Sequence, residues 1–223
     1  TYTYDRWSNL VKKVDALSNQ TTYNYDSSSN LTSVTDVLGT QSYTYNSLGQ
    51  VLTHTDRMSG VTTNTYDTAG NLLTTTDPLT NTTEFAYTSI GLLDTIEDAR
   101  GKITDFDYDS SGRMTKITDA NSKETDFTYN ARARVTSVTN ALSETTDFEY
   151  DDKDRLEKII YPDTNEVNFE YDLAGRRISV EDELGHATTY AYDDAYRLTS
   201  ITDALSHTTS FGYDLMSNLT SQT

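Results

Sequence analysis

Aspartates recur at fixed intervals along this 223-residue chain, and they are the residues with the most evident capacity for chemistry. Two rows stand out: Asp109, Asp151, Asp172 and Asp193, and then Asp98, Asp119, Asp182 and Asp203. Such rows could bind divalent cations or supply paired acids for catalysis. A catalytic pair needs one special place, whereas these acids recur throughout the chain. We therefore interpret them as turn-capping residues and predict no catalytic residue and no metal site.

Histidine is the second candidate for chemistry, and the chain has three: His54, His186 and His207. The last two occupy equivalent positions one repeat apart. No third ligand of suitable type accompanies them, so we interpret these histidines as surface turn residues. Cysteine is absent, which excludes disulfides and thiolate metal sites. We predict no cofactor.

Tyrosine is the third candidate, because rows of aromatic rings can bind carbohydrate by stacking. Glycan-binding repeats of about 20 residues use aromatics in this way. Those repeats are rich in Trp and Gly, however, and this chain has one tryptophan, Trp7. We favour a packing role for the tyrosines and keep carbohydrate binding as an alternative.

The tyrosines define a tandem repeat. Eleven of the 17 occupy one position of the repeat, here called the anchor: Tyr4, Tyr25, Tyr45, Tyr66, Tyr87, Tyr108, Tyr129, Tyr150, Tyr171, Tyr192 and Tyr213. The step between anchors is 21 residues nine times and 20 once. Two residues before each anchor lies another aromatic, except at Asn64. The pattern predicts a single array over residues 1–223, of about ten units and uncapped at both ends, which we expect to be a piece of a longer protein.

Spacing within the repeat predicts β-hairpins. In "TTDFEY" (145–150) the first Thr, the Phe and the Tyr alternate with other residues, as side chains on one strand face do. An Asp or Asn follows the anchor, and a Gly often follows three residues later, which is turn chemistry. A second strand and a second turn complete the unit, and Pro78 and Pro162 both lie in that second turn. No 3.6-residue period appears, so we expect no helix.

Two details of the predicted sheet can be worked out from positions alone. Leu198 and Ile201 differ in parity, so a regular strand cannot place both on one face; we expect a bulge or an outward leucine near the first turn. Equivalent strands of a meander lie roughly 9.6 Å apart, which predicts aromatic, aliphatic and aromatic side chains in alternation. About twenty strands exceed the usual size of a twisted open sheet, so we expect one large curved antiparallel sheet.

Composition excludes several classes of partner. The net charge is −18, which argues against nucleic acid and against anionic membrane surfaces. No apolar run is long enough to span a bilayer, so we expect no membrane insertion.

Three segments carry a family resemblance: "YDSSGRMTKITDA", "YDDAYRLTSITDALSHTTSFGYD" and "YPDTNEVNFEYD". They resemble the YD repeats of Rhs proteins, of toxin-complex shell proteins and of teneurins. The resemblance implies a section of an Rhs-type β-spiral shell, which encloses a C-terminal toxin in bacterial members and supports adhesion in teneurins. Thr88, Asn64 and Arg177 depart from the pattern. The family's toxin tail and its core region with self-cleaving aspartates have no counterpart in these residues, and ten units are too few for a closed shell.

The resemblance implies a non-enzymatic structural scaffold, a wall segment of a secreted or cell-surface shell. Expected partners are the remainder of the parent polypeptide, an enclosed toxin domain and neighbouring repeat arrays. The alternatives are a self-associating extracellular fibre subunit and a carbohydrate-binding repeat module. Four N-x-[ST] sequons, which a secreted chain would expose in or beside turns, begin at Asn19, Asn30, Asn81 and Asn218.

Overall fold

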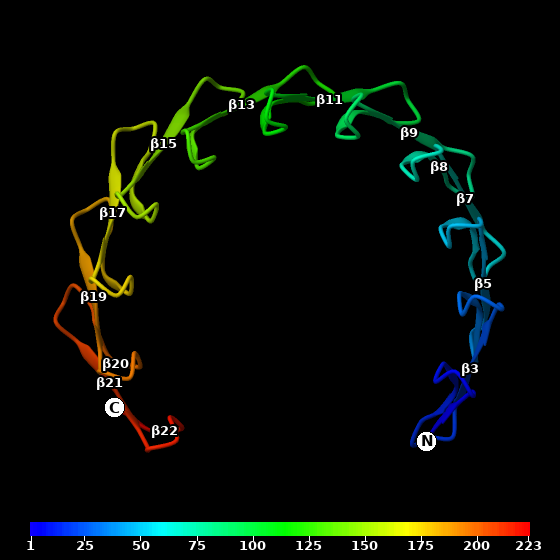
Figure 1. Cartoon of the computed structure of the whole chain (residues 1–223), viewed down its shortest axis with the longest axis horizontal. Helices are drawn as coiled ribbons and strands as arrows, with labels where there is room; N and C mark the ends of the chain where they lie inside the picture. Colours follow the sequence, from blue (N-terminus) through cyan, green and yellow to red (C-terminus); the bar gives the residue numbers. More distant parts are fainter. The chain divides into compact units, whose positions relative to one another are not determined.

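The computed structural model describes all 223 residues; it contains 22 β-strands joined by turns, and no helix. The chain groups into two compact units, Thr1–Asp107 with Thr118–Ser122 (unit 1) and Tyr108–Ile117 with Lys123–Thr223 (unit 2). Within each unit, described strand pairs are antiparallel and join strands adjacent in sequence, such as β15 with β16 and β16 with β17. Figure 1 shows these hairpins following one another in chain order. The all-β prediction is confirmed.

The strands are short, and most have five or six residues. The first eleven are β1 (Tyr2–Tyr4), β2 (Leu10–Val14), β3 (Gln20–Tyr25), β4 (Leu31–Asp36), β5 (Gly39–Tyr45), β6 (Val51–Thr55), β7 (Val61–Tyr66), β8 (Leu72–Thr76), β9 (Thr82–Tyr87), β10 (Leu93–Glu97) and β11 (Ile103–Tyr108). The others are β12 (Met114–Thr118), β13 (Glu124–Tyr129), β14 (Val135–Thr139), β15 (Thr145–Tyr150), β16 (Leu156–Ile160), β17 (Glu166–Tyr171), β18 (Arg177–Glu181), β19 (Ala187–Tyr192), β20 (Leu198–Thr202), β21 (Thr208–Tyr213) and β22 (Leu219–Gln222).

Two turns alternate along the array. The first turn begins directly after an anchor tyrosine, and the second turn begins ten residues later. Both have the same five-residue form: the first residue's N–H donates to the fifth carbonyl, and the fourth N–H donates to the first carbonyl, at 2.9 Å each for Asp151 to Arg155 and Asp154 to Asp151. The fourth residue of the five-residue turns has a positive φ; it is Gly in seven of these turns and another residue in thirteen. The missing residue of the array is absorbed in a tighter second turn, where Asp36 pairs with Gly39.

A β-bulge follows the first turn. In the β15–β16 pair, Glu149 faces Lys158 and Tyr150 faces Leu156, so Glu157 is the extra residue. The same register shift recurs in the other described pairs closed by a first turn. The bulge turns both Leu156 and Ile159 to the aromatic face, because it changes the strand's parity. Of the two expected alternatives, a bulge or an outward leucine, the structure shows the bulge.

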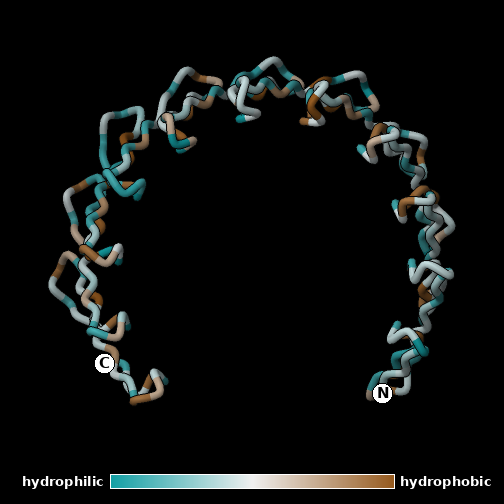
Figure 2. Tube along the Cα trace, viewed as in Figure 1, coloured by the Kyte–Doolittle hydropathy of each residue, from teal (hydrophilic) through white to brown (hydrophobic).

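The sheet is a single layer with almost no enclosed core, since Val34 is the only buried hydrophobic residue, at 8% exposure. Hydropathy along the trace alternates over short distances in Figure 2. On the aromatic face, Ile159 lies opposite Phe148 on one side and opposite Val167 on the other. The expected alternation of aromatic and aliphatic side chains is therefore only half right. On the β17 side the direct neighbour of Ile159 is Val167, which lies two residues before Phe169. Phe169 is therefore diagonal to Ile159 and not directly opposite it.

The opposite sheet face is polar. Threonine hydroxyls there pair across strands, with Oγ1 to Oγ1 distances of 2.7 Å for Thr44 and Thr53 and 2.8 Å for Thr139 and Thr145. Such pairs stabilise adjacent strands without an apolar partner layer.

Candidate functional site

The recurrent carboxylates cap the turns in which they lie. Asp151 Oδ1 accepts hydrogen bonds from the N–H groups of Lys153 at 2.8 Å and Arg155 at 3.0 Å. Its Oδ2 accepts from Arg155 Nε at 2.6 Å. Asp15 does the same in a second turn, with Leu17 and Asn19 as its donors. The interpretation of these acids as turn-capping residues is confirmed for the turns described.

Hydrogen bonding also sets the acidity of these groups. The bond from the Arg155 side chain holds the pKa of Asp151 below its ordinary value, and the Asn30 side chain has the same effect on the pKa of Asp26. A general acid at neutral pH needs the opposite shift. These carboxylates are therefore suited to hold backbone and cationic groups. The prediction of no catalytic residue and no metal site stays a prediction.

The three histidines fall into two environments. His186 and His207 are exposed fifth residues of second turns, with Nδ1 at 3.2 Å and 2.9 Å from Oδ2 of Asp182 and Asp203. The interpretation as surface turn residues is right for these two and wrong for His54. His54 lies in strand β6 and stacks on Tyr43, with ring centroids 4.8 Å apart. It occupies a ladder position that is aliphatic in most repeats, because a flat ring also fits against the neighbouring aromatic.

The anchor tyrosines bind the preceding hairpin through their hydroxyls. Tyr171 Oη donates to the carbonyl of Leu156 at 2.9 Å, and Tyr150 Oη donates to that of Val135 at 2.9 Å. Pairing between β16 and β17 begins only at Lys158, so the carbonyl of Leu156 has no ladder partner on that side. Other anchors make the same bond: Tyr25, Tyr45, Tyr66, Tyr87, Tyr129, Tyr192 and Tyr213.

Arginine connects four pairs of successive first turns in unit 2. Arg155 binds Asp151 in its own turn, and its Nη1 donates to the carbonyl of Asp172 in the next first turn at 3.1 Å. Its guanidinium carbon lies 4.5 Å from the centroid of the Tyr171 ring, which is cation–π distance. We call this arrangement the arginine clamp. It recurs at three other fifth positions of first turns: Arg113, Arg176 and Arg197.

Comparison with known proteins identifies this repeat. A family model described as Teneurin YD-shell matches residues 1–116 and 85–182, and one described as RHS Repeat matches residues 171–205 and 197–223. The chain belongs to the YD-repeat shell family. No curated protein matches this YD-repeat chain in sequence.

Solved toxin-complex structures share the fold of this YD-repeat segment. A crystal structure of TcdB2-TccC3-TEV is 16% identical, with a TM-score of 0.77 over 99% of this chain and 14% of that one. TcdB2-TccC3 without its hypervariable C-terminal region is 19% identical, with a TM-score of 0.71 over 100% of this chain and 15% of that one. A structure of the Photorhabdus luminescens Tc holotoxin pore is 17% identical, with a TM-score of 0.52 over 99% of this chain and 17% of that one. The chain thus spans only a small part of each protein it resembles in fold.

The two residues that name the YD repeat have separate structural roles. The tyrosine binds the backbone of the preceding hairpin, and the aspartate caps the turn that follows. The arginine clamp then joins that aspartate to the next tyrosine, as Arg155 joins Asp151 to Tyr171. Sequence reasoning missed the clamp, although a signal was available: arginine recurs at the fifth position of first turns in unit 2.

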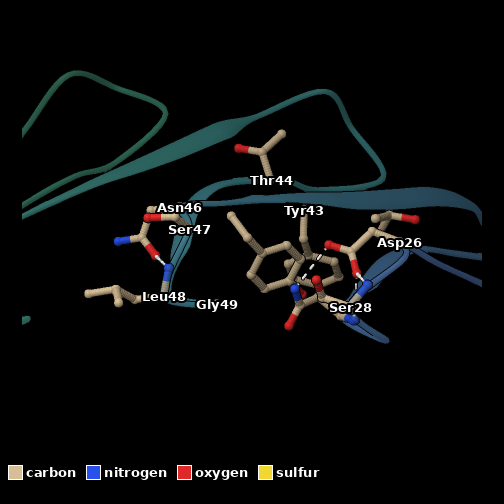
Figure 3. A pocket seen from close by; sticks show the side chains of 11 residues that line it. Asp26, Ser28, Tyr43, Thr44, Asn46, Ser47, Leu48 and Gly49 are labelled. Atoms are coloured by element: carbon tan, nitrogen blue, oxygen red, sulfur yellow. Dashed lines mark hydrogen bonds between the residues drawn. The ribbon is translucent and has the colours of Figure 1, made fainter.

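In unit 1 the clamp position holds shorter or uncharged residues: Asn9, Asn30, Gln50, Asn71 and Leu92. A cavity of about 480 Å³ lies beside Asn30, between the first turns that begin at Asp26 and Asn46. Tyr43 and Tyr45 also line it. Figure 3 shows the Tyr43 ring between the two turns, with Asp26 on one side and Asn46 on the other.

The structure has no helix long and apolar enough to cross a membrane.

Proposed function

We propose that this chain is a non-enzymatic wall segment of a YD-repeat shell, and that in its parent polypeptide the shell encloses a toxin domain. The observation that carries the proposal is the bonding between repeats. Each hairpin is held to the next by the backbone ladder, by an anchor hydroxyl such as that of Tyr171 and, in unit 2, by arginine clamps. A wall one layer thick needs such bonds, because it has little buried apolar area to stabilise it.

The enclosed toxin is supported by the similar structures rather than by a residue of this chain. Those structures are of TcdB2-TccC3 proteins and of a Tc holotoxin pore. We also propose a secreted or cell-surface location and an adhesive role, because the matching family model is described as Teneurin YD-shell. The net charge of −18 suits a large exposed sheet, because like charges oppose edge-to-edge association.

No observation favours the two alternative roles, a carbohydrate-binding module and a self-associating fibre subunit. The anchor hydroxyls already donate to backbone carbonyls, as at Tyr150, which leaves them unavailable as donors to a glycan. The net charge of −18 also opposes self-association into a fibre.

The test places one disruptive and one tolerated proline in the parent polypeptide. Val138 pairs with Phe127 on one side and Thr146 on the other, so Val138→Pro interrupts a central strand. Ala141→Pro is the matched control, because it places proline at the turn position that Pro78 and Pro162 occupy.

The measurement is the proteolysis half-life of the enclosed domain. Val138→Pro should shorten that half-life several-fold, and Ala141→Pro should leave it unchanged. Unchanged protection in Val138→Pro would refute the wall role. A parent protein with no protected domain would refute the enclosure and leave the adhesive role.

A further inference from the structure

The arginine clamp defines a binding site for a guanidinium group that this chain builds repeatedly. In each case the group contacts the aspartate of its own turn, the carbonyl that begins the next first turn, and the next anchor ring. For Arg176 the partners are Asp172 Oδ2 at 2.6 Å, the Asp193 carbonyl at 3.0 Å and the Tyr192 ring at 4.9 Å. Carboxylate, carbonyl and ring face together suit a planar cation better than a compact ammonium.

The first turn at Asp26 has the same surroundings without the arginine. Asn30 Nδ2 lies 2.9 Å from Asp26 Oδ2, in the place that arginine Nε takes elsewhere. A Cβ added to Gly49 would lie 3.4 Å from Asn30 Oδ1, as one added to Gly175 would lie 3.8 Å from Arg155 Nη1. The Asn30 side chain therefore points in the same direction as the clamp arginines, but it is too short to reach the next first turn.

The groups that would meet the missing guanidinium all line the cavity of about 480 Å³: Asp26, the Asn46 turn and the Tyr45 ring. The Asn46 carbonyl accepts one bond, from Gly49 N–H at 3.0 Å. The Asp172 carbonyl accepts the same bond from Gly175 and in addition binds Arg155, so a second donor fits this geometry.

Neighbouring clamp positions in unit 1 are satisfied within the chain. Gln50 Nε2 donates to the carbonyl of Gly70 at 2.7 Å, and Asn9 Nδ2 donates to Ser29 Oγ at 3.3 Å. No such bond to the next turn is made by Asn30, whose amide donates to Asp26 in its own turn. A cavity of about 390 Å³ also lies at Arg155, but no residue of the next first turn lines it. The cavity at Asn30 does reach the next first turn, at Asn46 and Gly49, and this distinguishes the Asn30 position.

We propose that the cavity between the turns of Asp26 and Asn46 binds an arginine side chain of a polypeptide partner. The partner's guanidinium takes the place that Arg113, Arg155, Arg176 and Arg197 fill in unit 2. The chain's net charge of −18 favours the approach of a basic segment.

The probe is Nα-acetyl-L-arginine amide, titrated into the isotopically labelled 223-residue chain and followed by amide NMR. We expect saturable shifts at Gly49, Asn46 and Tyr45 with a Kd on the order of 1 mM, the affinity of a single weakly held side chain. The citrulline analogue has nearly the same shape without the charge, and the lysine analogue has the charge without the plane. Both should bind at least several-fold more weakly.

Two variants separate the cavity from general charge. Asn30→Arg supplies the guanidinium from the chain itself and should abolish probe binding while the hairpins stay folded, because arginine already occupies the equivalent position at Arg155. Asn19→Arg is the matched control. Asn19 holds the same position in a second turn, donates to Asp15 at 2.9 Å, and begins a sequon as Asn30 does.

Binding that survives in Asn30→Arg, or that is lost equally in Asn19→Arg, would overturn the proposal. Equal binding of the citrulline analogue would overturn it as well, since the site would then not select a cation. The absence of saturable shifts at Gly49 would have the same meaning. None of these outcomes bears on the wall role, which the proline variants test.

Discussion

Removing the hydroxyl of Tyr171 tests whether anchor tyrosines hold successive hairpins together. Tyr171→Phe keeps the ring and deletes the bond to the Leu156 carbonyl at 2.9 Å. A hydrogen bond of this kind contributes about 1 kcal/mol net, and this one is part-buried. We therefore expect a loss of about 1 kcal/mol in the local free energy of opening, which is about a fivefold faster exchange of nearby amides.

The assay is native-state hydrogen exchange, because stability in a repeat array is local rather than all-or-none. Faster exchange should appear at the amides of β16 and β17, including Lys158 and Asn168, and leave unit 1 unchanged. Tyr161→Phe is the control: Tyr161 lies in the second turn of the same region, and its hydroxyl makes no hydrogen bond in the structure. Equal effects of the two variants would refute the reasoning, as would faster exchange spread evenly over both units.

Two further predictions concern the turns. Gly91 has φ +81°, and a Cβ added there would meet no other atom within 4 Å, so Gly91→Ala should destabilise its hairpin by about 1 kcal/mol through backbone strain alone. Ala133 has φ +62°, so Ala133→Gly should act in the opposite direction. Denaturant unfolding measures both effects. The pKa of folded turn carboxyls such as Asp151 lies below the ordinary value of 3.8, so their contribution to stability is fully present above that pH and is lost as the pH falls through the folded pKa. Melting temperature should therefore be flat from pH 7 to about 5 and fall below about pH 4; a flat profile down to pH 2 would contradict this.

Much of this fold was predictable because its determinants are local. An Asp followed three residues later by Gly specifies a turn within five residues, and alternation in "TTDFEY" specifies a strand within six. The parity of Leu198 and Ile201 narrowed the strand after the first turn to a bulge or an outward leucine, and the bulge is present. The diagonal placement of Phe169 was not predictable in this way. It depends on the register between β16 and β17 that the second turn sets, and the residue types alone do not specify that register.

The sequence by itself determined the 21-residue period, the hairpin and the capping role of its acids, because each of these depends on residues close together in the chain. Tertiary structure alone decided that the Tyr171 hydroxyl meets the Leu156 carbonyl, that Arg155 reaches Asp172, and that the cavity at Asn30 extends to the next first turn. These contacts join residues 15 to 17 positions apart on neighbouring hairpins. A periodic sequence presents many equivalent partners at such distances, and only the register of paired strands selects among them.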